Sequence, residues 1–340
     1  MRLKTIEKLK AQRSNSSQLL YPAREELLSP LSADDFRLSI KRLLSQRIAP
    51  VTFPLKRWWS DRQYSLSLDD WPYPLVVGHR FTGEWLYSRF EKLAGGWTGK
   101  RVLIPGANFN SNDARKWFPR PIESLHILDI VNWEPSFVAA SNELSSLCRS
   151  PLSFYHGTLD KIPLPDASID IVETAATLEH VGNMEATAAE LARVMTPNGL
   201  AFHGFGPLYF GYGGDHCIPA IGFEHGFDHL LLDDDHYHEI LHNEKLFNSL
   251  GVEAYNARYW AIQGIFSYLK PEEYLDAFKP WFDVVEIIAV ISDEAITFRE
   301  NFPESWQRLI DSGLAESDLL ITGISLLLKR KNTDVTNLVD

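Results

Sequence analysis

The sequence is poor in the features that mark secreted and membrane-spanning proteins. Its 340 residues contain only two cysteines, Cys148 and Cys217, and these form no CxxC pair. A disulfide framework is therefore excluded, and free thiols in a reducing compartment are expected. No apolar run approaches the roughly 20 residues that a transmembrane helix needs, and no apolar stretch follows the basic N-terminus as it would in a signal peptide. We expect a cytoplasmic protein with no membrane partner.

Basic residues are also in the minority. The chain has 33 Lys and Arg against 45 Asp and Glu, which gives a formal net charge of -12. Binding to a phosphate backbone needs clustered positive charge, so we expect no nucleic-acid partner. The apolar fraction of 45% is ordinary for a folded protein and is enough for a sizeable core.

The first part of the chain, residues 1–95, is expected to be a helical and aromatic extension. Ser32 precedes two acidic residues and then apolar residues at helical spacing, which predicts a helix over Ser32–Arg47. A second helix is predicted from Thr82 to Leu93. Between the two lie the aromatic residues Trp58, Trp59, Tyr64, Trp71 and Tyr73.

From Lys100 onward, short apolar runs alternate with helical stretches, which is typical of parallel βα units. We expect an α/β domain over residues 96–330, with a seven-stranded Rossmann-like sheet covered by helices on both faces, and a flexible tail over 331–340. The predicted strands are 101–105, 125–130, 152–156, 169–173, 200–204, 282–291 and 319–329. The predicted helices are 112–118, 135–147, 184–195, 234–250, 271–278 and 295–312.

The strand at Arg101–Pro105 ends in a glycine turn at Gly106. In a doubly wound sheet the ligand lies beyond the carboxyl ends of the strands, and a glycine there lets the backbone approach it closely. Asp129 ends the next strand, 23 residues after Gly106, and is placed to accept hydrogen bonds from two ribose hydroxyls. This spacing fits a dinucleotide and S-adenosylmethionine equally, although the first turn lacks the GxGxxG pattern of NAD-binding proteins.

Three downstream segments resemble class I S-adenosylmethionine-dependent methyltransferases of type 11. They are Gly157–Val172 (GTLDKIPLPDASIDIV), Leu178–Val181 (LEHV) followed by Glu190, and Arg193–Gly199 (RVMTPNG). The resemblance runs from about Lys100 to Gly206. It implies the methyltransferase sheet, S-adenosylmethionine as cofactor, and transfer of its methyl group to an acceptor.

The resemblance also implies a role for individual residues at the cofactor site. The glycine turn would lie against the methionine part, Asp129 with Ile130 at the ribose, Thr158 with Leu159 beside adenine, and Glu173 with Thr174 at the methyl-transfer site. The turn comprises Pro105, Gly106, Ala107, Asn108 and Asn110. Ile104, Asn108, Asn110 and Thr158 depart from the family pattern, and these departures motivate an alternative, a non-catalytic methyltransferase-like binding or regulatory protein.

Six of the eleven histidines fall between His216 and His242. His225 and His229 stand four apart, a spacing that can bind a metal on a helix, but we favour hydrogen-bonded, solvent-facing histidines and expect no metal. His216, His203 and His180 are the candidate bases, in that order, because the resemblance puts them at or beyond strand ends that face the cofactor.

Residues 207–250 are expected to form a lid or acceptor insertion, with a base at His216. Its aromatic residues would either form an apolar acceptor pocket or pack beneath the lid; they are Tyr209, Phe210, Tyr212, Phe223 and Phe227. We expect the protein to methylate an oxygen or nitrogen of a small molecule, in a specialised biosynthetic pathway. A homodimer is left open.

Overall fold

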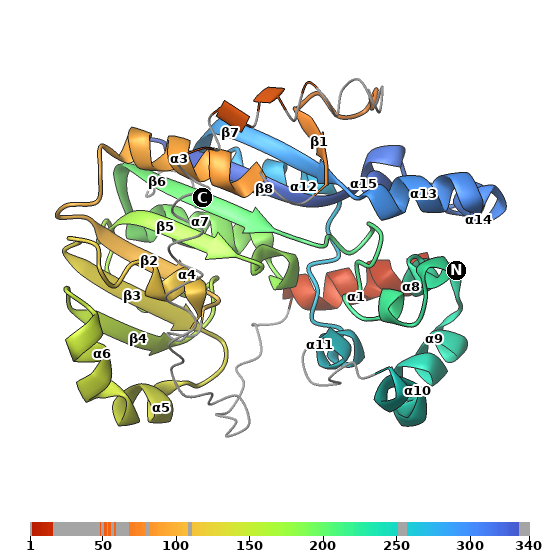
Figure 1. Ribbon diagram of the computed structural model, residues 1–340, viewed down its shortest axis with the longest axis horizontal. Helices are drawn as coiled ribbons and strands as arrows, with labels where there is room; N and C mark the ends of the chain where they lie inside the picture. The colour runs from red at the N-terminus through yellow and green to blue at the C-terminus, as the bar shows by residue number, and fades with distance from the viewer. Residues whose placement is uncertain are drawn as a thin grey trace.

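The computed structural model describes residues 2–15, 48, 51–52, 54–55, 58, 68–78, 82–107, 111–250 and 257–332. Within these residues a single eight-stranded sheet lies at the centre, with helices packed against it (Figure 1). The predicted helix Ser32–Arg47 and the predicted tail beyond residue 332 lie outside the described residues. No helix in the described ranges is long and apolar enough to cross a membrane.

The sheet is mixed, because one strand opposes its neighbours. The spatial order is β1-β7-β8-β6-β5-β2-β3-β4, and every neighbouring pair is parallel except those that β8 makes with β6 and β7. The strands are β1 (Leu75–Val77), β2 (Arg101–Pro105), β3 (Ser124–Asp129), β4 (Leu152–His156), β5 (Ile169–Ala175), β6 (Met195–Phe205), β7 (Phe282–Ile291) and β8 (Ile321–Arg330).

The expected α/β sheet is confirmed, but the count of seven strands is wrong. The seven predicted strands correspond to β2 through β8, and β2, β4 and β7 have the predicted bounds. The additional strand, β1, comes from the N-terminal extension and pairs Leu75 with Ala289 at the outer edge of β7. Three residues are too few to show the two-residue period of a strand, so this pairing left no signal in the sequence.

Successive residues of a strand point into two different apolar layers. In β2, Val102 and Ile104 pack into the layer that includes α3 (Thr82–Ala94), whereas Leu103 packs into the layer that includes α7 (Met184–Val194). A strand covered on both faces needs apolar side chains at successive positions. This requirement explains why β2 is a continuous apolar run in the sequence.

Several predicted helices are divided by a residue that ends one helix and starts the next. Pro303 begins α14 (Pro303–Asp311) after α13 (Asp293–Asn301), at the first helical position, where its missing N–H is not needed. Asn243 accepts a hydrogen bond from Leu246 N and so caps α10 (Glu244–Ser249) after α9 (Asp234–Leu241). The remaining helices are α4 (Asn112–Arg115), α5 (Glu134–Ala139), α6 (Ser141–Leu147), α8 (Asp228–Leu231), α11 (Ala257–Gln263), α12 (Pro271–Phe278) and α15 (Glu316–Leu320).

The N-terminal helix α1 (Leu3–Asn15) lies across the sheet end rather than apart from it (Figure 1). Ile6, only 1% exposed, belongs to the larger apolar core. At one end of the helix Arg2 Nε donates to Asp234 Oδ1 over 2.6 Å, and at the other Arg13 Nη2 donates to the His180 carbonyl over 2.7 Å. Helix α1 thus joins the insertion to the turn that follows β5.

We predict that Ile6→Ala destabilises the whole domain, because α1 contributes a buried side chain to the common core. Removing a buried isoleucine side chain down to alanine costs about 2–5 kcal/mol. Urea unfolding should therefore show a lower midpoint with an unchanged slope. Leu93→Ala is the matched control, since Leu93 is 49% exposed on α3 and its truncation should change the midpoint little. A midpoint unchanged by Ile6→Ala would mean that α1 is not part of the cooperative unit.

Candidate active site at the carboxyl edge of the sheet

The turn after β2 packs directly on the turn after β5. Gly106 has φ +68°, and a Cβ built on it would lie 2.4 Å from Thr177 Oγ1 and Cγ2. Thr177 is held in turn by a hydrogen bond from its hydroxyl to the Ala175 carbonyl, at 2.9 Å. Glycine is therefore required at position 106 for both its backbone angle and its lack of a side chain. The contact that the structure shows at Gly106 is with Thr177, in the chain after β5, and the predicted approach of this turn to a ligand stays a prediction.

The other predicted residues of the glycine turn are placed only in part. Pro105 ends β2, and Ala107 is buried at 6% exposure. Asn108 and Asn110 lie outside the described residues.

Asp129 stands at the end of β3, as predicted. Its Oδ1 accepts a hydrogen bond from Val131 N at 2.8 Å, which fixes the carboxylate at the strand end. Burial raises the pKa of Asp129 to about 6. The next residue, Ile130, is also half-buried, and its carbonyl lies 3.0 Å from His156 Nε2 on the neighbouring strand end.

Thr158 and Leu159 follow β4 on the same edge of the sheet. Thr158 forms an isolated antiparallel bridge with Lys161, which closes a tight turn. The Leu159 side chain is 5% exposed and packs into the larger core. Their predicted place beside adenine stays a prediction.

Glu173 and Thr174, predicted at the methyl-transfer site, direct their side chains into the domain. The Glu173 carboxylate, 2% exposed, pairs with Lys116 and accepts a hydrogen bond from Trp117 Nε1 at 2.9 Å. The Thr174 hydroxyl lies 2.8 Å from His203 Nδ1. Both side chains are thus occupied by internal partners, so neither is available as a polar contact without breaking them.

His203 does not face the crevice, so that expectation is wrong. Its ring has no exposed surface and stacks on Phe278 of α12, with the ring centroids 5.2 Å apart. The cause is strand alternation: Ala201 and Phe205 of β6 point into the same layer, and His203 lies between them in the two-residue period. Burial lowers its pKa to about 3, so it is a neutral core residue.

Glu179 lies in the LEHV segment and had no predicted role, but the structure places it in the candidate site. It lies in the short 3-10 helix η2 (Leu178–His180) and is 1% exposed. Its Oε1 accepts a hydrogen bond from Gly206 N at 3.1 Å, while Oε2 has no partner among the described residues. Burial raises the pKa of Glu179 to about 8, which keeps the carboxyl mostly protonated at neutral pH.

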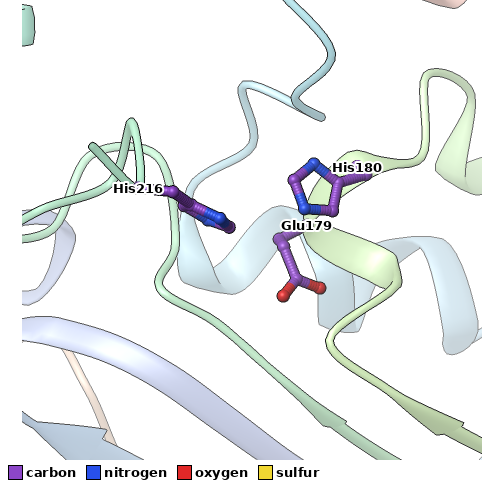
Figure 2. A group of neighbouring side chains, drawn as sticks. All are labelled: Glu179, His180 and His216. Carbon is purple, nitrogen blue, oxygen red and sulfur yellow. The ribbon is translucent and has the colours of Figure 1, made fainter. Parts of the chain in front are cut away.

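His180 and His216 face each other beside Glu179, with their ring centroids 5.0 Å apart (Figure 2). His180 Nδ1 donates to the Ile265 carbonyl at 2.6 Å, and His216 Nε2 donates to the Pro207 carbonyl at 3.1 Å. A carbonyl only accepts, so each hydrogen bond fixes the tautomer and leaves a lone pair on the opposite nitrogen. The available atoms are His180 Nε2 and His216 Nδ1.

The three side chains form one cluster. One carboxylate oxygen of Glu179 and one nitrogen of each histidine lie within 4.8 Å of one another. Burial lowers the pKa of His180 to about 3, and it lowers the pKa of His216 as well, although the Pro207 carbonyl and Asp215 oppose the shift at His216. Both rings are neutral at pH 7, and His180 is too weakly basic to hold a proton there. His216 is the better proton acceptor of the pair.

Aromatic rings surround this cluster, though they are not the ones predicted. Phe266 lies 5.5 Å from His180 and 5.3 Å from His216 between ring centroids, and Trp260 lies 5.3 Å from His180. They come from residues 257–268, a segment with no predicted role. The predicted aromatic residues of the insertion pack on one another and on segments outside it; for example, Phe227 is fully buried, and its ring centroid lies 4.9 Å from that of Phe298 on α13.

The other histidines of the insertion do not join the cluster. His225 pairs with Asp228 at 2.6 Å, and His229 is fully buried, with Nε2 donating to the Tyr209 carbonyl at 2.7 Å. Residues 238–242 read HEILH, which is an HExxH sequence that the prediction of no metal did not take into account. These two rings lie on the exposed face of α9, with centroids 3.9 Å apart.

Comparisons with known proteins match part of this domain to a family model. A family model described as a methyltransferase domain matches residues 118–203, whereas no curated protein matches the chain.

Three solved structures are among those to which this chain is similar. A putative sarcosine dimethylglycine methyltransferase from Galdieria sulphuraria is 11% identical, with 74% of this chain and 85% of that chain covered and a TM-score of 0.44. An S-adenosylmethionine-dependent methyltransferase from Mesorhizobium loti is 16% identical; the alignment covers 73% of this chain and 98% of that chain, with a TM-score of 0.43. Phosphoethanolamine N-methyltransferase 2 from Haemonchus contortus, solved with S-adenosyl-L-methionine, is 12% identical; the alignment covers 78% of this chain and 55% of that chain, with a TM-score of 0.42.

The match over residues 118–203 contains Asp129, the β5 strand end and the Glu179–His180 pair, all of which lie at the carboxyl edge described above. Residues 118–203 thus match the methyltransferase domain model, and S-adenosylmethionine is the cofactor that this match indicates.

Proposed function

We propose that the protein transfers a methyl group from S-adenosylmethionine to an oxygen or nitrogen of a small molecule. The observation that carries this proposal is the Glu179–His180–His216 cluster, in which the carboxyl group is buried and the two histidines are half-buried. Glu179 lies two residues after Thr177, which contacts the Gly106 turn, so the cluster adjoins the strand ends where the cofactor is expected. Proton-accepting groups and aromatic rings at such a place suit an acceptor whose reacting atom must lose a proton.

The chemical step asks little of the protein, because the sulfonium already activates the methyl group. The acceptor oxygen or nitrogen forms a bond to the methyl carbon, the carbon–sulfur bond breaks, and its electron pair stays on sulfur as S-adenosylhomocysteine forms. The acceptor proton passes to Nδ1 of His216. The protein's contribution is to hold the acceptor in line and to exclude water.

A screen of small molecules tests the activity itself. The full chain, with cofactor carrying a labelled methyl group, is incubated with panels of hydroxylated compounds and of amines, and methylated products are counted. Transfer to a member of either panel supports the proposal. Tight cofactor binding with no transfer to any acceptor favours the non-catalytic alternative.

Asp129→Ala should weaken cofactor binding by roughly 10-fold or more, because a charged acceptor of hydroxyl hydrogen bonds contributes about 1.5–3 kcal/mol. Calorimetric titration with S-adenosylmethionine measures the effect. Asp276→Ala is the control, since Asp276 is an exposed carboxylate that pairs with Lys279 on α12. An affinity that Asp129→Ala leaves unchanged would remove Asp129 from the cofactor site.

Cofactor affinity should also depend on pH through Asp129. Ribose hydroxyls donate to the ionised carboxylate, and burial raises its pKa to about 6 in the free protein. Affinity is therefore constant above about pH 6 and falls below it, by up to about 10-fold for each pH unit. Titrations at several pH values compare the native chain with Asp129→Asn, which has no such group. A native affinity that is flat down to about pH 5 would contradict the assignment.

His216→Ala should lower turnover of the acceptor by about 100-fold or more while cofactor affinity stays within about 2-fold, because a base acts on the acceptor and not on the sulfonium. Turnover with the acceptor from the screen and calorimetry on the same sample give the two values. His236→Ala is the control: that histidine is exposed and pairs with Asp233. Equal losses of turnover and cofactor affinity would show that His216 is structural.

A further inference from the structure

A buried polar atom without a partner lies inside the cluster of Glu179, His180 and His216. Among the described residues, the hydrogen bonds to these side chains use Glu179 Oε1, His180 Nδ1 and His216 Nε2. Glu179 Oε2 is buried without a partner in that part of the chain, and an unpaired buried polar group costs about 1–3 kcal/mol. This cost, at an atom beside two imidazole rings, indicates that the cluster holds a ligand.

The chemistry of the three atoms fits a metal ion of the transition series. Two imidazole nitrogens and one carboxylate oxygen are the ligand types that Zn²⁺ uses when three protein groups bind it. The backbone bonds of the two rings strengthen this interpretation, because a metal-binding histidine usually donates its other N–H to a carbonyl or carboxylate. The Ile265 and Pro207 carbonyls accept these two hydrogen bonds here.

The spacing is also close to that of a bound ion. Ligands about 2.1 Å from a tetrahedral zinc are about 3.4 Å from each other, and one ligand atom from each of the three side chains lies within 4.8 Å of the other two. Closing that gap needs shifts of about 1 Å, which side-chain rotation can supply. Figure 2 shows the three side chains entering from two sides, Glu179 and His180 from η2 and His216 from the loop that follows β6.

We propose that Glu179, His180 and His216 bind a divalent transition-metal ion such as Zn²⁺, and that the bound ion inhibits methyl transfer. The ion takes the lone pair of His216 Nδ1, the atom that would accept the acceptor's proton; this second half rests on the proposed function. The metal-free protein is the active form.

The HEILH segment offers a rival place for the same ion. His238 and His242 supply two nitrogens on an exposed helix face, but no third ligand accompanies them among the described residues, where the only group of three is the Glu179 cluster. Two exposed ligands bind less tightly than three ligands that are buried or half-buried and held by backbone hydrogen bonds. His242→Ala is therefore the matched control for the cluster variants.

The experiment uses the full chain after treatment with EDTA and desalting. ZnCl₂ is titrated calorimetrically, and CoCl₂ is added while the visible absorption of tetrahedral cobalt is recorded. We expect one tight equivalent of zinc and a cobalt spectrum of that type. Glu179→Gln and His216→Ala should each weaken this equivalent by about 100-fold or more, whereas His242→Ala should leave it unchanged. Glu179→Gln retains the shape of the side chain and so guards against a folding defect.

Three further measurements are made on the same samples. Turnover should be unaffected by EDTA, should fall as zinc fills the site, and should return when EDTA is added again. S-adenosylmethionine affinity should change by less than about 2-fold with zinc. The proposal is overturned if micromolar zinc does not bind, if His242→Ala abolishes binding while the cluster variants keep it, or if zinc raises turnover. If zinc binds but S-adenosylmethionine does not, the proposed function is wrong and the metal site is supported.

Discussion

The contact between Gly106 and Thr177 is the constraint on which the carboxyl edge of the sheet depends. With no room for a Cβ between them, the turn after β2 and the turn after β5 meet backbone to side chain. Thr177 is followed directly by η2, so the same contact determines where Glu179 and His180 lie. A larger residue at 106 would have to displace the turn that carries two of the three cluster residues. The turn after β2 and the Glu179–His180 pair are thus coupled through one close approach.

Segments that are far apart in the chain complete the cluster. His216 comes from the insertion, the Ile265 carbonyl that orients His180 comes from the chain before α12, and Arg13 of α1 donates to the His180 backbone. Helix α1 is fixed at its other end to Asp234 of the insertion. The insertion, residues 207–250, is therefore packed against the domain: its aromatic residues belong to or contact the larger core, and its loop positions His216 in the cluster.

The polarity of the cluster is set by burial. Removing charged groups from water disfavours ionisation, which raises the pKa of Glu179 and lowers those of the two histidines, so all three are neutral together. Among the described residues, each of the three side chains has one hydrogen bond to the backbone, and Glu179 Oε2 has no partner. A cluster of this type can take an acceptor hydroxyl or a metal ion, and the two uses exclude each other because they need the same lone pair of His216.

The sequence by itself determined the elements that have strong local signals. Short apolar runs predicted the bounds of β2, β4 and β7, and the glycine turn and Asp129 were predicted at the ends of two strands, where the structure has them. Tertiary structure decided the rest. β1 is too short to show a period and forms only because β7 offers an edge. His203 points into the layer next to α12 because side chains alternate between the two faces of a strand. Glu179 forms a cluster only because the fold places Gly206, His180 and His216 beside it. Such roles depend on contacts between side chains that are far apart in the sequence, and the spacing of residues along the chain does not predict these contacts.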